Sequence, residues 1–359
     1  MTPETIALRR LASQQIAHPT FDAPGEVVRR LGAVQAQDYL GALWAVGLRT
    51  RGATERSVEQ ALEARAIVRT WPMRGTLHFV PPADVRWMLE LLTPRVVQRS
   101  AARLRQLGLD APTIAASAEV LVRALEGGRR LTRPAVFAAL ESAGIATGGQ
   151  RGYHILTQLA YERLICFGPR DGRQPTFTLL DEWAPSARSL PRDEALATLA
   201  LRYFTGHGPA TLQDFMWWSG LTAADARAGS GAAATQLERA VVEGREYYFA
   251  GDAAHTPEDA PGAFLLPPFD EYLVGYRDRS AMLDQRHAPM VVPSANGVFN
   301  PIVVIGGRVV GSWKRTLQKD TVAITFSPFA ALDEAQARTL ADAAGRYGDF
   351  LGKRVVRGG

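Results

Sequence analysis

Two glutamines stand one residue apart in the segment Val34-Gln35-Ala36-Gln37-Asp38, which follows an amphipathic stretch near the start of the chain. If this segment is extended, Gln35 and Gln37 point to the same face, because side chains alternate along a strand. Paired neutral amides can hold a water molecule by donating and accepting hydrogen bonds together. The pair therefore suggests a site that positions water, although two exposed polar residues after a helix would have the same spacing.

A second group of polar residues lies in the C-terminal third. The segments Phe269-Asp270-Glu271-Tyr272 and Arg277-Asp278-Arg279 combine three carboxyl groups with two arginines. The pattern favours a salt-bridged loop that braces the C-terminal strands. The alternative is acid/base catalysis by Asp270, Glu271 and Asp278 in a small-molecule hydrolase.

Other familiar catalytic signatures are missing from the sequence. It contains no phosphate loop, no dinucleotide glycine fingerprint, no HExxH and no GxSxG motif. Cys166 is the single cysteine, so an internal disulfide and a cysteine-based metal cage are excluded. The histidines lack the spacing of metal ligands and are expected to be surface or hydrogen-bonded residues. They are His18, His78, His154, His207, His255 and His287.

Charge is distributed unevenly along the 359 residues, although the net value is only +5. Residues 1–170 hold 22 arginines against 14 acidic residues, whereas residues 171–359 hold 19 basic against 22 acidic residues. Only three of the 41 basic residues are lysine. Arginine suits phosphate because its planar fork bonds two oxygens, although GC-rich codon usage also enriches it. The basic first half predicts a nucleic-acid surface there.

The composition is that of a soluble globular protein, with 47% hydrophobic and 21% charged residues. No stretch approaches the roughly 18 consecutive apolar residues of a membrane span. The first residues lack the apolar core of a signal peptide. These features predict a cytoplasmic protein without a membrane partner.

Helices joined to short hairpins recur along the chain. The first set has helices at 3–16, 24–34, 40–48 and 57–64, capped at Thr2 and Asp22, then strands at 67–71 and 76–80. The second has helices at 83–106, 112–126, 132–140 and 153–161, then strands at 164–167 and 176–180. The third has helices at 193–204, at 212–218 and after Thr222, then strands near 236–242 and 246–250. Each set matches the winged helix-turn-helix pattern.

The last part of the chain has a different pattern. Residues 264–268 form an apolar run that ends in prolines. Strands are expected at 301–305, 308–313 and 322–326, followed by a helix at 333–351, and Gly306-Gly307 suits a two-residue hairpin turn. The predicted fold is α+β, with three tandem winged helix-turn-helix units and a β-rich C-terminal segment. The predicted domains are 1–106, 107–190 and 191–359.

Several motifs together resemble the bacterial winged-helix DNA glycosylases. The Gln35-Ala36-Gln37-Asp38 segment, followed by Leu43-Trp44-Ala45-Val46-Gly47-Leu48-Arg49, is similar to the signature of that family. Further similar segments occur in the same order, over roughly residues 5–350. They are 69–78, 265–272, 275–279, 297–301 and 311–315.

This resemblance implies a C-shaped monomer whose basic concave face grips double-stranded DNA. It implies hydrolysis of the N-glycosidic bond of cationic N7-alkylguanine lesions, including those in interstrand crosslinks, without a metal or organic cofactor. The family carries catalysis on a Q-x-Q or Q-x-D motif, which falls here on Gln35 and Gln37, as in the crosslink-unhooking branch. Asp38 lies one position later and would offer support at most. Such a protein would associate with the nucleoid when bound to DNA.

Candidate DNA contacts are assigned from side-chain chemistry. They are Arg74, His78, Arg151, Tyr153, Arg277, Arg279, Lys314 and Arg315. The alternative function is a winged-helix DNA-binding protein without catalysis, such as a transcriptional regulator, because a fold does not determine a function.

Overall fold

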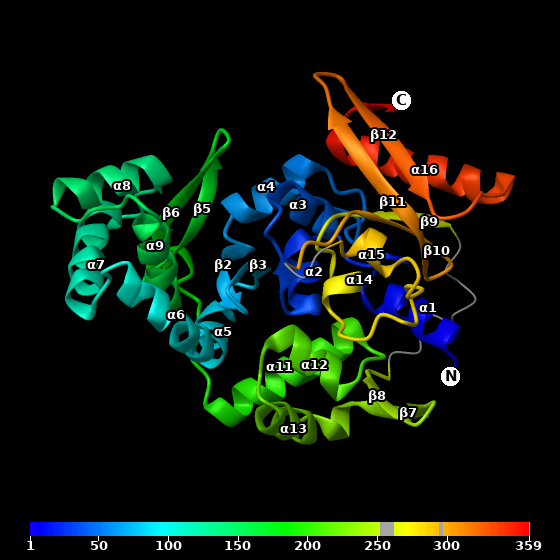
Figure 1. Ribbon diagram of the computed structural model, residues 1–359, viewed down its shortest axis with the longest axis horizontal. Coiled ribbons are helices and arrows are strands. Elements are labelled where there is room, and N and C mark those ends of the chain that lie inside the picture. Colours follow the sequence, from blue (N-terminus) through cyan, green and yellow to red (C-terminus); the bar gives the residue numbers. More distant parts are fainter. Residues whose placement is uncertain (252–261, 294–296, 359) are drawn as a thin grey trace. The chain divides into compact units, whose positions relative to one another are not determined.

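The computed structural model describes residues 1–251, 262–293 and 297–358 and has a mixed α+β fold (Figure 1). The chain forms two compact units. Unit 1 combines residues 1–58 with residues 196–359, and unit 2 comprises residues 59–195. This grouping differs from the three consecutive segments predicted from the recurring helices and hairpins. The predicted division at residues 106 and 190 stays a prediction.

The N-terminal part of unit 1 is helical. It contains α1 (Pro3–Ser13), α2 (Pro24–Leu31), the short strand β1 (Val34–Gln35) and α3 (Tyr39–Gly47), and α4 (Glu55–Glu63) leads into unit 2. The Thr2 side chain caps α1 as predicted, accepting from the Thr5 amide. The predicted cap at Asp22 is wrong. Ala23 precedes α2 without a side-chain cap, and Asp22 pairs with Arg51 instead.

Unit 2 packs helices against a small sheet. Its helices are α5 (Val85–Leu92), α6 (Pro94–Gln106), α7 (Ala111–Leu125), α8 (Arg133–Ser142), α9 (Arg151–Tyr161) and α10 (Leu180–Trp183). The single helix predicted over 83–106 is therefore two helices. Proline lacks an N–H and clashes inside a helix, so Pro94 starts α6 rather than continuing α5.

The two hairpins predicted in this region pair with each other. Within unit 2 the strands lie in the order β3 (Thr76–Val80), β2 (Val68–Met73), β5 (Ile165–Asp171), β6 (Gln174–Leu179) and β4 (Leu131–Thr132). The link is antiparallel and pairs Arg69 with Phe167. Leu121, Val136 and Ile155 have no exposed surface and form part of the core beneath.

The second part of unit 1 begins with the third set of helices and strands. These are α11 (Arg192–His207), α12 (Leu212–Ser219), α13 (Ala223–Ala232), the short η1 (Ala234–Gln236), β7 (Glu238–Val242) and β8 (Arg245–Phe249). Thr222 caps α13 as its sequence position suggests. All the elements predicted for this set are present, in the predicted order.

The C-terminal sheet has the order β13 (Arg354–Arg357), β12 (Thr321–Pro328), β11 (Arg308–Leu317), β10 (Ile302–Ile305) and β9 (Ala263–Leu266). It is antiparallel except between β12 and β13. The predicted Gly306-Gly307 turn is confirmed, and both residues have the positive φ that favours glycine. Strand β13 was not predicted. The segment between β9 and β10 carries α14 (Glu271–Val274) and α15 (Ala288–Val291).

Helix α16 (Glu334–Leu351) covers this sheet and also packs on α3. The Trp44 ring lies 5.0 Å from the rings of Tyr347 and Phe350, measured between centroids. A Cβ added at Gly47 would overlap the Phe350 ring, so a glycine is needed where the two helices touch. Packing between α3 and α16 thus fixes the helix that follows the two glutamines.

Candidate active site

The Gln35–Gln37 segment is a short extended stretch between two helices. Gly32 ends α2 with a positive φ, β1 follows, and Asp38 then begins α3. Gln35 is only 8% exposed, whereas Gln37 is exposed to solvent. The Asp38 carboxylate accepts from the Gly41 amide at 2.7 Å and so caps α3. In this segment the Gln37 side chain is therefore exposed to solvent and the Gln35 side chain is buried.

A buried carboxylate holds the backbone of this segment. The Gln35 amide donates to Glu271 Oε1 at 2.8 Å, and Glu271 has no exposed surface. The other oxygen, Oε2, accepts from Trp218 Nε1 at 3.0 Å and lies 3.2 Å from His207 Nε2. No local sequence pattern predicts the contact between Gln35 and Glu271, because the two residues are 236 positions apart.

Helix α3 is tied to the same C-terminal segment. Arg49 forms a bidentate pair with Asp270, and its Nη2 also donates to Gln14 Oε1 at 2.9 Å. The Trp44 indole donates to the Leu265 carbonyl at 2.6 Å. Residues 265–271 thus form a support against which the glutamine segment and the following helix are placed.

The salt-bridged loop predicted around Asp270 and Arg277 is present, but its ion pairs differ from the local ones expected. Asp270 pairs with Arg49, and Asp278 pairs with Arg245, so both partners lie far away in the sequence. Asp270 and Glu271 are buried and bound by protein donors, which leaves no open carboxylate pair at this position. This arrangement does not support the small-molecule hydrolase alternative.

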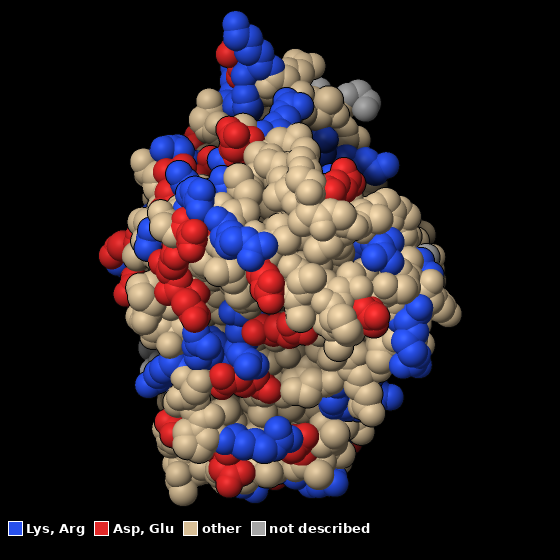
Figure 2. Space-filling model, turned by 90° about the vertical axis from the view of Figure 1, so that its left-hand side faces the viewer, with Lys and Arg blue, Asp and Glu red and all other residues tan. Residues whose placement is uncertain are grey.

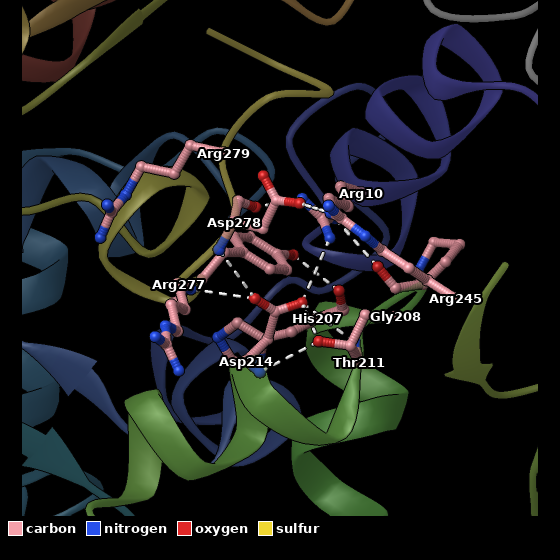
Figure 3. A network of polar contacts seen from close by, with 12 residues as sticks. Arg10, His207, Gly208, Thr211, Asp214, Arg245, Arg277, Asp278 and Arg279 are labelled. Carbon is pink, nitrogen blue, oxygen red and sulfur yellow. Dashed lines mark hydrogen bonds and ion pairs between the residues drawn. The ribbon is translucent and has the colours of Figure 1, made fainter. Parts of the chain in front are cut away.

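A second buried carboxylate holds the backbone of the loop that carries Arg277 (Figure 3). Asp214 accepts from the amides of Arg277 and Asp278 at 2.9 and 3.1 Å, and it completes a capping box with Thr211. Arg10 Nη2 lies 3.6 Å from the same carboxylate. In Figure 3 the Arg277 side chain extends away from this network. It lines a groove of about 680 Å³ with Gln213, Arg245 and Tyr248 among its walls.

The pKa of Asp278 lies below its ordinary value. Burial alone would raise that pKa, but hydrogen bonds from Ser280 and the charge of Arg245 outweigh it. Arg279, the other arginine of this loop, donates from Nε to the Leu273 carbonyl at 2.8 Å and lies 5.0 Å from the Phe299 ring centroid. Asp278 is therefore charged at neutral pH. The Arg279 side chain binds the backbone of its own loop and is partly exposed to solvent.

The candidate DNA contacts in unit 2 have different environments. Arg74 occupies the β2–β3 turn with a positive φ and is partly exposed, and Tyr153 on α9 is 49% exposed. Arg151 uses its guanidinium within the unit, binding the carbonyls of Ala146 and Leu107. His78 on β3 has no exposed surface, and its Nδ1 lies 3.0 Å from the Thr76 carbonyl oxygen. The structure therefore gives no support to His78 as a DNA contact.

Lys314 and Arg315 lie within β11, which extends beyond the strand predicted over 308–313. Lys314 is exposed, whereas Arg315 is half-buried and donates to the Tyr347 hydroxyl. Burial raises the pKa of Tyr347 to about 12, although the Arg315 charge opposes that rise. Of the two residues, Lys314 is the one open to solvent.

The structure shows no metal centre in residues 1–251, 262–293 and 297–358, where no three His, Cys, Asp or Glu side chains come together to hold an ion. His207 is buried against Glu271, which agrees with a hydrogen-bonded histidine. His255 lies outside the described residues. Over the same ranges, none of the helices combines the length and apolar character that crossing a bilayer requires.

The charged side chains on one face of the molecule are of mixed sign. Figure 2 shows Lys and Arg side chains interspersed with Asp and Glu on this face, so no single sign of charge covers it. On this face, binding to DNA phosphates would therefore rest on particular arginines rather than on uniform charge.

The comparisons with known proteins decide the family. A family model described as DNA glycosylase AlkZ-like matches residues 28–350. The chain belongs to this family. An AlkZ-like relative, the interstrand DNA cross-link repair glycosylase of Streptomyces sahachiroi, is 30% identical over 321 residues, which cover 85% of each chain. The solved structure of Streptomyces sahachiroi DNA glycosylase AlkZ has a TM-score of 0.80 and 27% identity. That match covers 99% of this chain and 100% of the other.

Proposed function

We propose that this AlkZ-like DNA glycosylase hydrolyses the N-glycosidic bond of cationic N7-alkylguanine in duplex DNA and thereby unhooks interstrand crosslinks. The observation that carries the proposal is the Gln35–Gln37 segment, whose backbone is fixed by Glu271 while Gln37 faces solvent. The name of the Streptomyces sahachiroi relative supports the crosslink as a substrate.

The chemistry suits neutral amide groups. An N7-alkylguanine already carries positive charge, so it leaves as a neutral base without protonation by the enzyme. Water attacks C1′ of the sugar, the bond from C1′ to N9 breaks with its electron pair going to the base, and the water loses a proton to solvent. A positioned water and electrostatic support for the oxocarbenium-like sugar are the remaining needs.

Gln37 and Gln35 have different roles in this proposal. The exposed Gln37 amide holds the attacking water, because an amide can donate and accept at once. The Gln35 side chain is buried apart from 8% of its surface, and in this proposal it assists Gln37 from a position near the sugar. Asp38 is used in capping α3 and acts on the site only through that helix.

The proposed architecture is three tandem winged helix-turn-helix units, over 1–106, 107–190 and 191–359, in a C-shaped monomer that binds duplex DNA. It is supported by the recurrence of helices before the hairpins β2–β3, β5–β6 and β7–β8. Arg74, Tyr153, Arg277 and Lys314 are the proposed DNA contacts that stand at least partly open to solvent. Arg151, Arg279 and Arg315 would serve secondarily, since each also binds its own unit.

The decisive experiment is single-turnover release of 7-methylguanine from duplex DNA, with unhooking of a defined interstrand crosslink measured separately. Wild type is compared with Gln35→Ala/Gln37→Ala at saturating protein, and duplex binding is measured in parallel. We expect the double variant to lose excision by at least about 10²-fold while it keeps its DNA affinity. Unchanged excision would reject the catalytic assignment, and duplex binding without base release by wild type would favour a non-catalytic regulator.

A further inference from the structure

We propose that Glu271 is a positioning residue for glycosidic-bond hydrolysis, acting through the Gln35 backbone with His207 and Trp218 as its own supports. This inference rests on the proposed function of the glutamine pair. Glu271 does not touch the substrate. Its effect passes through one hydrogen bond, from the Gln35 amide to Oε1 at 2.8 Å.

The contacts of Glu271 join three distant parts of unit 1. Gln35 belongs to β1, His207 ends α11, and Trp218 lies on α12. The side chains of His207 and Trp218 have no exposed surface, and the buried Tyr203 ring stacks on the His207 ring at a centroid distance of 4.8 Å. A Cβ added at Gly275 would come within 2.8 Å of the His207 ring, so Gly275 also packs closely against the histidine.

The hydrogen-bond inventory at this point requires a carboxylate rather than an amide. The Gln35 amide and the Trp218 indole can only donate, and each faces a different oxygen of Glu271. A glutamine side chain has only one acceptor oxygen. In Glu271→Gln its NH₂ group would therefore face either the Gln35 backbone N–H or the Trp218 indole N–H, and two donors would meet. His207 is more tolerant, because it can present either a donor or an acceptor at Nε2 by changing tautomer.

The consequence for the reaction follows from the short length of β1. Strand β1 has only two residues, and Gln37 lies two positions after the backbone N–H of Gln35 that Glu271 binds. If that N–H loses its acceptor, the backbone before α3 can shift, and the side-chain amides of Gln35 and Gln37 shift with it. A displacement of about 1 Å in a catalytic group can cost roughly 10²-fold in rate.

The test compares Glu271→Gln with Asp84→Asn. Asp84 of unit 2 is a matched control, because it is also a buried carboxylate that accepts an indole N–H at 3.0 Å, from Trp87. Each variant is assayed for thermal stability, duplex affinity and single-turnover release of 7-methylguanine at saturating protein. We expect both to lose stability. Only Glu271→Gln should slow excision, by about 10- to 100-fold, with duplex affinity within twofold of wild type.

A second substitution separates positioning from general destabilisation. Trp218→Phe removes the competing indole donor, so the amide oxygen in Glu271→Gln/Trp218→Phe is free to accept from Gln35. We expect this double variant to release base several-fold faster than Glu271→Gln, even though it loses further packing. Full excision by Glu271→Gln, or no recovery in the double variant, would overturn the inference.

The wild-type protein supplies a measurement that does not depend on whether these variants fold. With selective ¹⁵N-glutamine labelling, the Gln35 amide should exchange slowly with solvent deuterium, and rapid exchange would overturn the inference. The two proposals fail differently. Full activity in Glu271→Gln with an inactive Gln35→Ala/Gln37→Ala rejects only the positioning role, whereas an active glutamine double variant rejects the catalytic assignment itself.

Discussion

Arg49 and Asp270 form a bidentate ion pair in the interior of unit 1, with Nη2–Oδ1 and Nη1–Oδ2 distances of 2.8 and 2.9 Å. Neither side chain is more than 1% exposed, and the two residues are 221 positions apart. The pair joins the end of α3 to the start of α14. Helix α3 follows the segment that contains Gln35, and α14 begins with Glu271. Its geometry therefore bears on both the stability and the shape of the candidate active site.

Removing Arg49 should be strongly destabilising. Arg49→Met leaves the Asp270 charge buried without its partner, and breaking a buried pair on one side typically costs about 3–5 kcal/mol. The measurement is the free energy of unfolding from chemical denaturation. Arg51→Ala is the matched control, because Arg51 pairs with Asp22 at the surface and should cost less than about 1 kcal/mol. Equal losses in the two variants would contradict the prediction.

Asp38 should matter mainly through the α3 cap. Asp38→Ala should lower the free energy of unfolding by about 1 kcal/mol, while Asp38→Asn should lower it less, since asparagine also caps helices well. Both should slow base release less than Gln37→Ala does. The rates come from single-turnover excision and the stabilities from thermal melts. Loss of excision in Asp38→Asn alone would mean that the carboxylate takes part in the chemistry.

Arg277→Ala should weaken DNA binding without slowing the chemical step. Its guanidinium extends from a loop whose backbone Asp214 fixes, so the substitution removes charge while the loop stays in place. If Arg277 contacts a phosphate, the slope of log affinity against log salt should fall by about one. Arg338→Ala on α16 removes the same charge from an exposed i,i+4 pair and is the control. Identical binding by the two variants would remove Arg277 from the interface.

Duplex binding as a whole should depend steeply on salt and little on sequence. Contacts to six or more phosphates would reduce affinity by roughly 10³-fold or more between about 50 and 200 mM salt. Fluorescence anisotropy with several unrelated duplexes measures both properties. A flat salt response would argue against a phosphate-dominated interface, and a preference of many thousandfold for one palindrome would favour a regulator.

The Asp278 carboxylate should add a contribution to stability that depends on pH. Its folded pKa is lower than the ordinary value of 3.8, so folding favours the charged form. The stabilisation is therefore fully present above about pH 4 and is lost as the pH falls through the folded pKa. Wild type should be more stable than Asp278→Asn at pH 7, and the difference should shrink towards pH 2. A difference that does not change with pH would contradict this.

Local patterns in the sequence were sufficient for most individual elements. The Gly306-Gly307 hairpin, the Thr2 cap and the paired strands around Arg74 follow from turn, capping and alternation rules that act over a few residues. Pro94 carried the signal for a helix boundary that the prediction over 83–106 did not use. Asp22 is of a residue type that often caps helices, but its carboxylate binds Arg51 instead.

The support of the candidate site lay beyond such rules. The contacts of Gln35 with Glu271 and of Arg49 with Asp270 join residues more than 200 positions apart. His78 illustrates the same limit, since its strand-like neighbours predict a hairpin but do not reveal which face is buried. The resemblance predicts a role for Gln35 and Gln37, and the structure adds the carboxylate that binds the Gln35 backbone.

The composition of unit 1 from both ends of the chain has a consequence for synthesis on the ribosome. Residues 1–58 emerge first, but their buried partners at 265–271 emerge about 200 residues later. At a synthesis rate of about 5–20 residues per second, those partners are added roughly 10–40 s after α3, and the apolar face of α3 stays unpaired with them for that time. A polypeptide released before Glu271 has been added would carry both glutamines without the carboxylate that binds the Gln35 backbone. Incomplete chains of this protein would therefore lack the ordered form of the proposed site, whatever DNA their finished portions bind.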